Sequence, residues 1–177
     1  MRRAIHQRTI HPNTTERHLM HRATVAVIFA LLLLVTPAGA LNATSIQLSK
    51  AGGAPVALTV ESLSGLPALE QDISFQTSKG TKHARYKGVL MWDLLKANGF
   101  IDESGHHNEL RQIFSVVGAD GYRIDFSVGE IAPDFGNKAI MLSTQEDGRP
   151  LSPPTLTVPG DKRGARNVHD VVRIEVR

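Results

Sequence analysis

The chain has 177 residues, of which 20 are basic and 17 are acidic, and it contains no cysteine. The absence of cysteine excludes disulfide bonds and any metal ion that is held by a thiolate. No internal repeat or low-complexity tract interrupts the chain, and one domain is the natural count for this length.

The first 40 residues are typical of an export signal. Arginines precede an unbroken apolar run from Val25 to Val35, and a small-residue pattern follows that ends at Ala40. The run is shorter than the roughly 20 apolar residues that a membrane-spanning helix needs, so we expect cleavage after Ala40 rather than a permanent anchor. The polar stretch before Met20 is long for a signal, and Met20 offers an alternative start of translation.

Export changes the charge balance of the chain. Five arginines and Glu16 lie in the first 40 residues, so 15 basic and 16 acidic residues remain after cleavage. A role in binding nucleic acid therefore loses its electrostatic support. Residues 41–55 are small and polar, and we expect a flexible leader with at most an edge strand near Ile46 to Leu48. The domain would then occupy residues 56–177.

The first half of this domain mixes strand and helix signals. Thr59 can cap a short helical turn over 60–64, and the alternation of apolar and polar residues over 73–77 predicts a half-buried strand. Residues 78–87 are rich in cations and are typical of a basic loop or ribbon. Apolar residues at helical spacing predict one full helix over 89–97.

The second half consists mainly of strands. Alternating segments at 111–117 and 122–128 flank an Asp120-Gly121 pair, which is typical of a β-hairpin. Three further strands are predicted, at 138–144, 156–158 and 169–176. The expected fold class is α+β, with a strand-rich mixed sheet.

One loop in this half has the composition of a ligand site. It runs from Val158 to His169 and contains two glycines and the cations Lys162, Arg163 and Arg166. Such a loop can bring backbone N–H groups and guanidinium groups onto an anion or onto a planar polar ring. We therefore expect ligand binding here.

The order of several short motifs resembles the molybdopterin-binding domain of the sulfite oxidase family over nearly all of residues 56–177. The motifs are Gly88-Val89-Leu90-x-x-Asp93-Leu94-Leu95, Gly118-x-Asp120-Gly121, Asp147-Gly148-Arg149-Pro150-Leu151, Val158-Pro159-Gly160 and Gly164-Ala165-Arg166-x-Val168. The resemblance implies the mixed α+β fold of that domain, in which the Gly-Ala-Arg loop lies against the pterin cofactor.

By this resemblance, Arg166 is expected to hold a pterin, and the loop around it is expected to contact the same ligand. The full set of residues that we expect to bind the ligand is Arg166, Asn167, Val168, His169, Gly164, Ala165, Asp120, Tyr122, Thr77 and Trp92.

The chain departs from the enzymes of this family at three positions. His169 stands where they usually have a lysine, and Asp120 falls where sulfite-oxidising members place a tyrosine next to the substrate. The metal-binding cysteine should lie on the 73–77 strand or just after it, where this chain offers only Ser74, Gln76, Thr77 and Ser78. These departures argue against molybdenum redox catalysis, so we expect no metal site and no catalytic residues. Pterin binding is compatible with all of them.

A smaller group of secreted, cysteine-free proteins resembles this chain in length and signal sequence. Members of this group look like periplasmic receptors for reduced pterins that act on the sensor domain of a membrane-anchored enzyme making or degrading cyclic di-GMP. The resemblance therefore implies a monomeric, non-catalytic pterin-binding protein of the periplasm that takes part in biofilm control.

Several of these residues also have a structural interpretation. Trp92 lies among apolar helix positions and is favoured as a core residue over a ring that stacks on a ligand. Asp120 is a common hairpin turn residue. Arg166 can simply pair with Asp170, and the adjacent His106-His107 pair points in different directions, which disfavours a metal site.

Two functions from other classes remain as alternatives. The first is a molybdopterin-dependent oxidoreductase whose metal is bound by the cofactor's dithiolene alone, with water or Asp120 as a further ligand. The second is a scaffold module that binds only protein.

Overall fold

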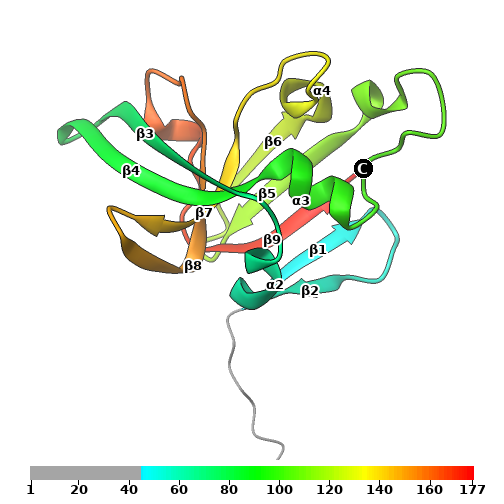
Figure 1. Ribbon diagram of the computed structural model, residues 1–177, viewed down its shortest axis with the longest axis horizontal. Coiled ribbons are helices and arrows are strands. Elements are labelled where there is room, and N and C mark those ends of the chain that lie inside the picture. Colours follow the sequence, from blue (N-terminus) through cyan, green and yellow to red (C-terminus); the bar gives the residue numbers. More distant parts are fainter. Residues whose placement is uncertain (1–44) are drawn as a thin grey trace, which may run out of the picture. The chain divides into compact units, whose positions relative to one another are not determined.

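The computed structural model describes residues 45–177, and the predicted signal peptide and the alternative start at Met20 lie outside the described residues. The strands of the described part form two sheets (Figure 1). The first sheet has the order β2-β1-β9-β5-β6, and only the β1–β9 pair in it is parallel. Its strands are β1 (Ile46–Lys50), β2 (Val56–Leu58), β5 (Ile113–Gly118), β6 (Arg123–Ser127) and β9 (Val171–Val176).

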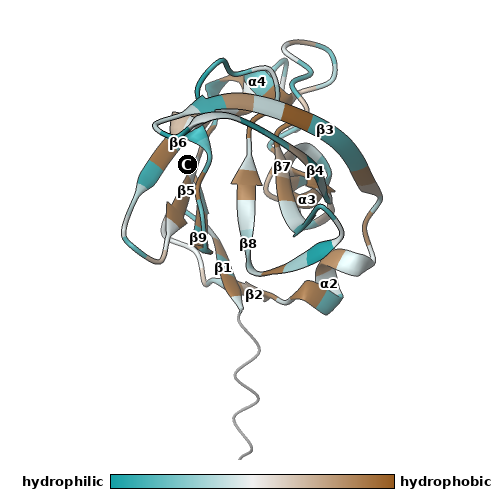
Figure 2. Cartoon of the chain, turned by 90° about the vertical axis from the view of Figure 1, so that its left-hand side faces the viewer, coloured by the Kyte–Doolittle hydropathy of each residue, from teal (hydrophilic) through white to brown (hydrophobic). Residues whose placement is uncertain are grey.

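The second sheet is antiparallel throughout and has the order β3-β4-β7-β8. Its strands are β3 (Ala68–Thr77), β4 (Gly80–Leu90), β7 (Met141–Glu146) and β8 (Arg149–Thr157). Strand β8 contains three prolines and lies at the edge of the sheet, where proline is tolerated because the strand pairs on one side only. Bands of hydrophilic and hydrophobic residues alternate along the β3–β4 ribbon (Figure 2), as expected for strands with one buried face.

The helical elements are few and short. They are α2 (Val60–Ser64), α3 (Met91–Ala97), α4 (Val128–Ile131) and the 3-10 turns η1 (Asn108–Arg111) and η2 (Gly164–Arg166). Helix α2 begins with a capping box, because the Ser62 backbone N–H donates to Thr59 Oγ1 and the Thr59 N–H donates to Ser62 Oγ. None of the helices between residues 45 and 177 is long and apolar enough to cross a bilayer.

Two groups of buried apolar side chains hold the domain together. The larger group joins the first sheet to α3 and includes Phe114, Ile174 and Leu94, all fully buried. The smaller group lies under the β3–β4 ribbon and includes Phe75 and Tyr86. Burial of each large apolar side chain stabilises the folded state by about 1.5–3 kcal/mol. The α+β, strand-rich class that the sequence predicts is confirmed.

Several boundaries differ from the predictions: β7 begins at Met141 rather than at 138, and β8 spans Arg149–Thr157 rather than 156–158. Two further differences have a clear physical cause. The segment 46–50 is not the edge strand of a flexible leader, because β1 lies between β2 and β9 and buries Ile46 and Leu48 completely. Parallel pairing with β9, at the other end of the chain, is a long-range contact that a short polar segment does not reveal. The predicted helix 89–97 begins only at Met91, because Val89 and Leu90 still pair with β7.

Candidate functional site

The predicted ligand loop connects β8 to β9 and lies along the end of β3. The Gln76 N–H donates to the Lys162 carbonyl at 2.9 Å, and Gln76 and Arg163 form a parallel bridge. A second bridge joins Leu156 to Val168, so both ends of the loop are tied to strands. The loop therefore has a fixed position beside the β3–β4 turn.

A hollow of about 640 Å³ lies between this loop and the end of β3. Its walls come from two segments, and none of the described residues that line it carries a carboxylate. The lining residues are Phe75, Gln76, Thr77, Ser78, Arg163, Gly164, Ala165 and His169. The hollow thus combines one permanent cation, an imidazole, an amide, two hydroxyls and an aromatic ring.

Gly164 is necessary for the shape of this hollow. A Cβ atom at this position would lie 2.5 Å from Cδ2 and 2.6 Å from Cε2 of Phe75. Contacts this short are not tolerated, so any larger residue would displace the Phe75 ring. The glycine of the family motif therefore allows the loop to pack flat against the aromatic ring.

The turn of the β5–β6 hairpin supports the loop from another side. The Tyr122 hydroxyl donates to the Ala165 carbonyl at 2.6 Å, and the Ala119 N–H donates to the Asp170 carbonyl at 2.9 Å. Asp120 acts within its own turn, where its carboxylate accepts the Tyr122 N–H at 2.9 Å. The structure brings Asp120 and Tyr122 to the loop, but neither lines the hollow.

Arg166 lies on η2 but does not line the hollow. Its Nε and Nη2 atoms donate to the two carboxylate oxygens of Asp161 at 2.7 and 2.8 Å, and Nη1 donates to Glu130 at 3.1 Å. The guanidinium carbon also lies 5.3 Å from the centre of the Phe126 ring. Two carboxylates therefore take the donors that the sequence analysis assigned to a ligand, and the predicted Asp170 is not the partner.

This ion pair changes the acidity of both groups. Hydrogen bonds from Arg166 lower the pKa of Asp161, and Lys138 at 2.6 Å lowers it further against the opposing effect of partial burial. Hydrogen bonding to Asp161 raises the pKa of Arg166. Because Asp161 precedes η2 and Lys138 precedes β7, the network fastens the loop to the second sheet.

The next two residues of the motif are part of the protein interior. Asn167 is buried, and its side-chain oxygen accepts the Val158 N–H at 2.9 Å. Val168 is fully buried in the larger core cluster. Both side chains hold the loop in shape, and neither reaches the hollow.

Trp92 lies elsewhere, on α3. It lines a separate hollow together with His106, His107 and Phe135, and Lys96 Nζ lies 5.7 Å from its ring centre. Of the predicted ligand residues, the hollow beside η2 therefore contains Thr77, Gly164, Ala165 and His169, and not Trp92. No group of three potential metal-binding side chains was found among residues 45–177.

Four lining residues were missed in the predicted ligand set, namely Phe75, Gln76, Ser78 and Arg163. A signal for three of them was present, because the resemblance places the metal-binding cysteine on or just after the 73–77 strand. Extending the predicted site over that whole segment would have included them. Arg163 is three residues before Arg166, and only the pairing of Arg166 with Asp161 on the same loop and with the distant Glu130 distinguishes the two.

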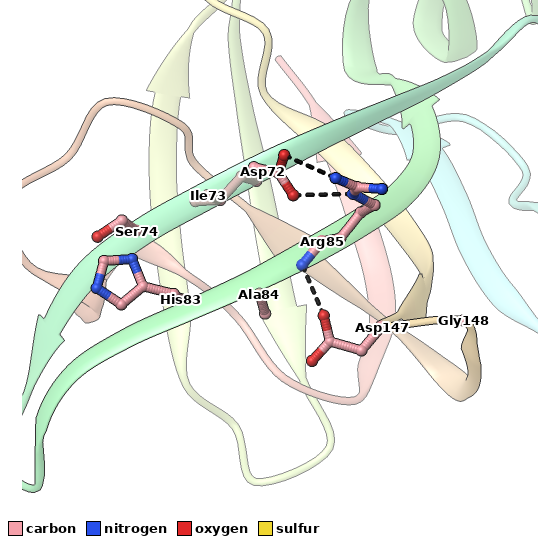
Figure 3. A pocket seen from close by; sticks show the side chains of 8 residues that line it. All are labelled: Asp72, Ile73, Ser74, His83, Ala84, Arg85, Asp147 and Gly148. Atoms are coloured by element: carbon pink, nitrogen blue, oxygen red, sulfur yellow. Dashed lines mark hydrogen bonds and ion pairs between the residues drawn. The ribbon is translucent and has the colours of Figure 1, made fainter.

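A larger hollow of about 760 Å³ lies against the β3–β4 ribbon, and Figure 3 shows its lining residues. Its main charged groups are already paired: Arg85 donates from Nε and Nη2 to Asp72 at 2.9 and 3.0 Å, which lowers the pKa of Asp72. Asp147 accepts the Arg85 backbone N–H at 2.8 Å. The hollow beside η2 is the better candidate, because Arg163 there forms no ion pair with a described residue.

Comparison with known proteins supports the fold. Neither the known protein-family models nor the curated proteins gave a match. Among solved structures, the sulfane dehydrogenase SoxCD from Paracoccus pantotrophus, a sulfite oxidase family member, is similar with a TM-score of 0.55 and 18% sequence identity. The similarity covers 75% of this chain and 37% of that chain. It supports a sulfite-oxidase-like fold.

Proposed function

We propose that this chain is a non-catalytic periplasmic protein that binds a reduced, metal-free pterin in the hollow beside η2. A pterin is a flat bicyclic ring with a hydrogen-bonding edge, and a suitable site needs apolar walls with a few converging polar groups. Phe75 and the face of Gly164 supply the walls. Arg163 offers donors and the Gln76 side-chain oxygen offers an acceptor for the edge, whereas the Thr77 hydroxyl is already bonded to Gly80 and Lys79 within the β3–β4 turn.

The observation that carries the proposal is the chemistry at the end of β3. The resemblance places a metal-binding cysteine in this segment, and here the hollow is lined by the hydroxyls of Thr77 and Ser78. The chain has no cysteine at all. A neutral hydroxyl does not replace a thiolate as a soft metal ligand, so these residues do not fit thiolate-held molybdenum, whereas they do fit a pterin ring alone.

We further propose that the pterin-bound state acts on the periplasmic sensor domain of a membrane-anchored enzyme that makes or degrades cyclic di-GMP. Such regulation requires that the partner binds one ligand state more tightly than the other. The coupling free energy between two sites is typically about 1–3 kcal/mol and acts equally in both directions. Saturating pterin should therefore tighten or weaken partner binding by that amount.

Mass spectrometry of the protein purified from its native periplasm tests ligand identity, and a metal-free pterin is expected. The location is tested by Gly164→Ala, which forces the Phe75 ring out of place and should weaken binding of a reduced pterin at least about tenfold. Gly65→Ala is the matched control, because its added Cβ would lie 3.6 Å from the Ser62 carbonyl, an ordinary contact. Equal affinities of the two variants would contradict the proposed location.

The likeness to a dehydrogenase favours one alternative, a molybdopterin-dependent oxidoreductase whose metal is bound by the cofactor alone. A molybdenum dithiolene absorbs visible light and a free reduced pterin does not. Stoichiometric molybdenum together with visible absorption in the native protein would replace our proposal by this alternative. If the protein binds no pterin at all, the second alternative remains, which is a scaffold module that binds only protein.

A further inference from the structure

The β3–β4 ribbon continues beyond the rest of its sheet. Strand β4 pairs with β3 along its whole length, down to Thr77 opposite Gly80, whereas its pairing with β7 ends at Tyr86 opposite Glu146. In Figure 1 the ribbon runs on past the β7–β8 hairpin. Residues 80–84 of β4 therefore have a neighbouring strand on one side only.

The free side of β4 carries unused backbone groups. The Arg85 N–H donates to Asp147 Oδ1 at 2.8 Å and the Arg85 carbonyl accepts the Asp147 N–H at 2.7 Å, so Arg85 faces the β7 side. Because backbone directions alternate along a strand, His83 and Thr81 face the same side. Their N–H and C=O groups have no backbone partner among the described residues.

The hollow in Figure 3 adjoins this free edge. It measures about 760 Å³, and it is lined by Asp72, Ser74, His83 and Arg85 on the ribbon and by the Asp147-Gly148 turn where β7 ends. The carboxylates of Asp72 and Asp147 in this lining are already bonded to Arg85. The outward side chains of a strand added to β4 would lie beside His83 and Arg85. The structure therefore offers both backbone groups and side-chain space at one edge.

The charge of the ribbon favours an added strand of a particular charge. Residues 78–87 contain five basic residues and no acidic one. Lys82 pairs with Glu146 and Arg85 pairs with Asp72, but Lys79, His83 and Lys87 form no ion pair with a described residue. Like charges on neighbouring strands destabilise a sheet, so a second copy of β4 is a poor partner.

We propose that residues 80–84 of β4 bind an extended segment of a partner protein as an added strand, and that this segment carries alternating carboxylates. Strand addition of this kind takes its affinity from backbone hydrogen bonds and its specificity from the side chains that flank them. Exposed strand edges with unpaired backbone groups are the sites at which it occurs.

A peptide of alternating valine and glutamate is the probe, and a peptide of alternating valine and lysine is the control. Amide hydrogen exchange of Thr81 and His83 should slow at least about tenfold on binding the acidic probe. Exchange at Lys82 and Ala84 should not change, because these residues face β3. Equal binding of both peptides, or unchanged exchange at Thr81 and His83, would overturn the proposal. No pterin is present, so the outcome is independent of the proposed function.

Two proline variants locate the edge. His83→Pro removes an N–H on the free side of β4 and should weaken binding of the acidic peptide about tenfold. Glu70→Pro is the matched control, since Glu70 lies on β3 outside the hollow and, by alternation from Gln76, whose N–H donates to Lys162, faces the other edge of the ribbon. Equal loss in both variants overturns the proposal. If melting curves show that His83→Pro fails to fold, the proposal is tested by amide exchange at Thr81 and His83 in the unmodified protein.

Discussion

Two arginines on one loop, three residues apart, have opposite surroundings. Arg166 is held by Asp161 and Glu130, and its neighbours Asn167 and Val168 are buried. Arg163 lines the open hollow and forms no ion pair with a described residue. The loop therefore has an inner side that maintains its shape and an outer side that is available for a ligand. A positive charge in a motif that resembles a known family does not by itself identify a binding residue.

The largest effect should follow from the loss of Arg166. Arg166→Ala leaves Asp161 and Glu130 without their charged donor and should lower the free energy of unfolding by about 1–2 kcal/mol, less than for a fully buried pair because the group is partly exposed. Arg166→Lys should restore only part of this loss, since lysine cannot donate to both oxygens of Asp161 in parallel. Chemical denaturation measures the effect.

This result would separate the two sides of the loop. The family resemblance led to the expectation that Arg166 holds a pterin, and the structure instead shows it paired with two carboxylates. If Arg166→Ala keeps the stability of the unmodified protein and loses only pterin affinity, the inner side of the loop is part of the binding site after all.

Arg163 should show the opposite behaviour. Arg163→Ala removes the permanent cation of the hollow and should weaken pterin binding about fivefold to tenfold, equal to about 1–1.4 kcal/mol, with an unchanged melting temperature. Lys162→Ala is the matched control, because the bond between Lys162 and β3 is made by its backbone carbonyl, which alanine keeps, and Lys162 does not line the hollow. Calorimetric titration of a reduced pterin into both variants measures the difference, and similar affinities would place the ligand outside this hollow.

A smaller loss of stability is expected from the hydrogen bond by which the β5–β6 hairpin supports the loop. Tyr122→Phe removes the hydrogen bond to the Ala165 carbonyl, which is exposed enough to be rehydrated, so the loss of stability should be about 0.5–1 kcal/mol. Thermal melting measures it. A loss of pterin affinity without any change in melting would show that the hydroxyl contacts the ligand instead.

The smallest effect should be a pH dependence that comes from Asp161. Its pKa in the folded protein is lowered from the ordinary value of 3.8, mainly by hydrogen bonds from Arg166. The carboxylate therefore contributes stability above pH 3.8, and this contribution is lost as the pH falls below 3.8 through the lowered pKa. When the pH is lowered from about 5 to about 2, the free energy of unfolding should fall less for Asp161→Asn than for the unmodified protein. Parallel pH profiles would contradict this role.

The sequence predicted correctly those elements that are specified by a pattern of only a few neighbouring residues. The capping box at Thr59, the hairpin around Asp120-Gly121 and the ligand loop all lie where the sequence places them. The hydrogen bonds of the cap and the hairpin join residues that are close in the chain, so residue type and spacing are sufficient there, whereas the bonds that hold the loop reach β3 and the β5–β6 turn. The start of α3 was less predictable, because pairing between β4 and β7 competes with the helix for Val89 and Leu90.

The candidate site was predicted in part for the same reason. Thr77, Gly164, Ala165 and His169 of the predicted set line one hollow, since the family resemblance identifies the two segments that meet there. Trp92 was assigned by its ring alone and lies beside a different hollow. The signal peptide, the periplasmic location and the pterin remain predictions.

The sequence by itself determined the α+β class, the lack of any thiolate ligand and the loop that borders the hollow, because composition and short-range spacing are sufficient for each. Only the tertiary structure decided that β1 lies inside a sheet, that Arg166 pairs with Glu130 36 residues away, and that Tyr122 supports Ala165. Those outcomes depend on which side chains the packed core brings within hydrogen-bonding distance. A guanidinium group binds the nearest well-placed carboxylate, and the fold alone sets which carboxylate is nearest.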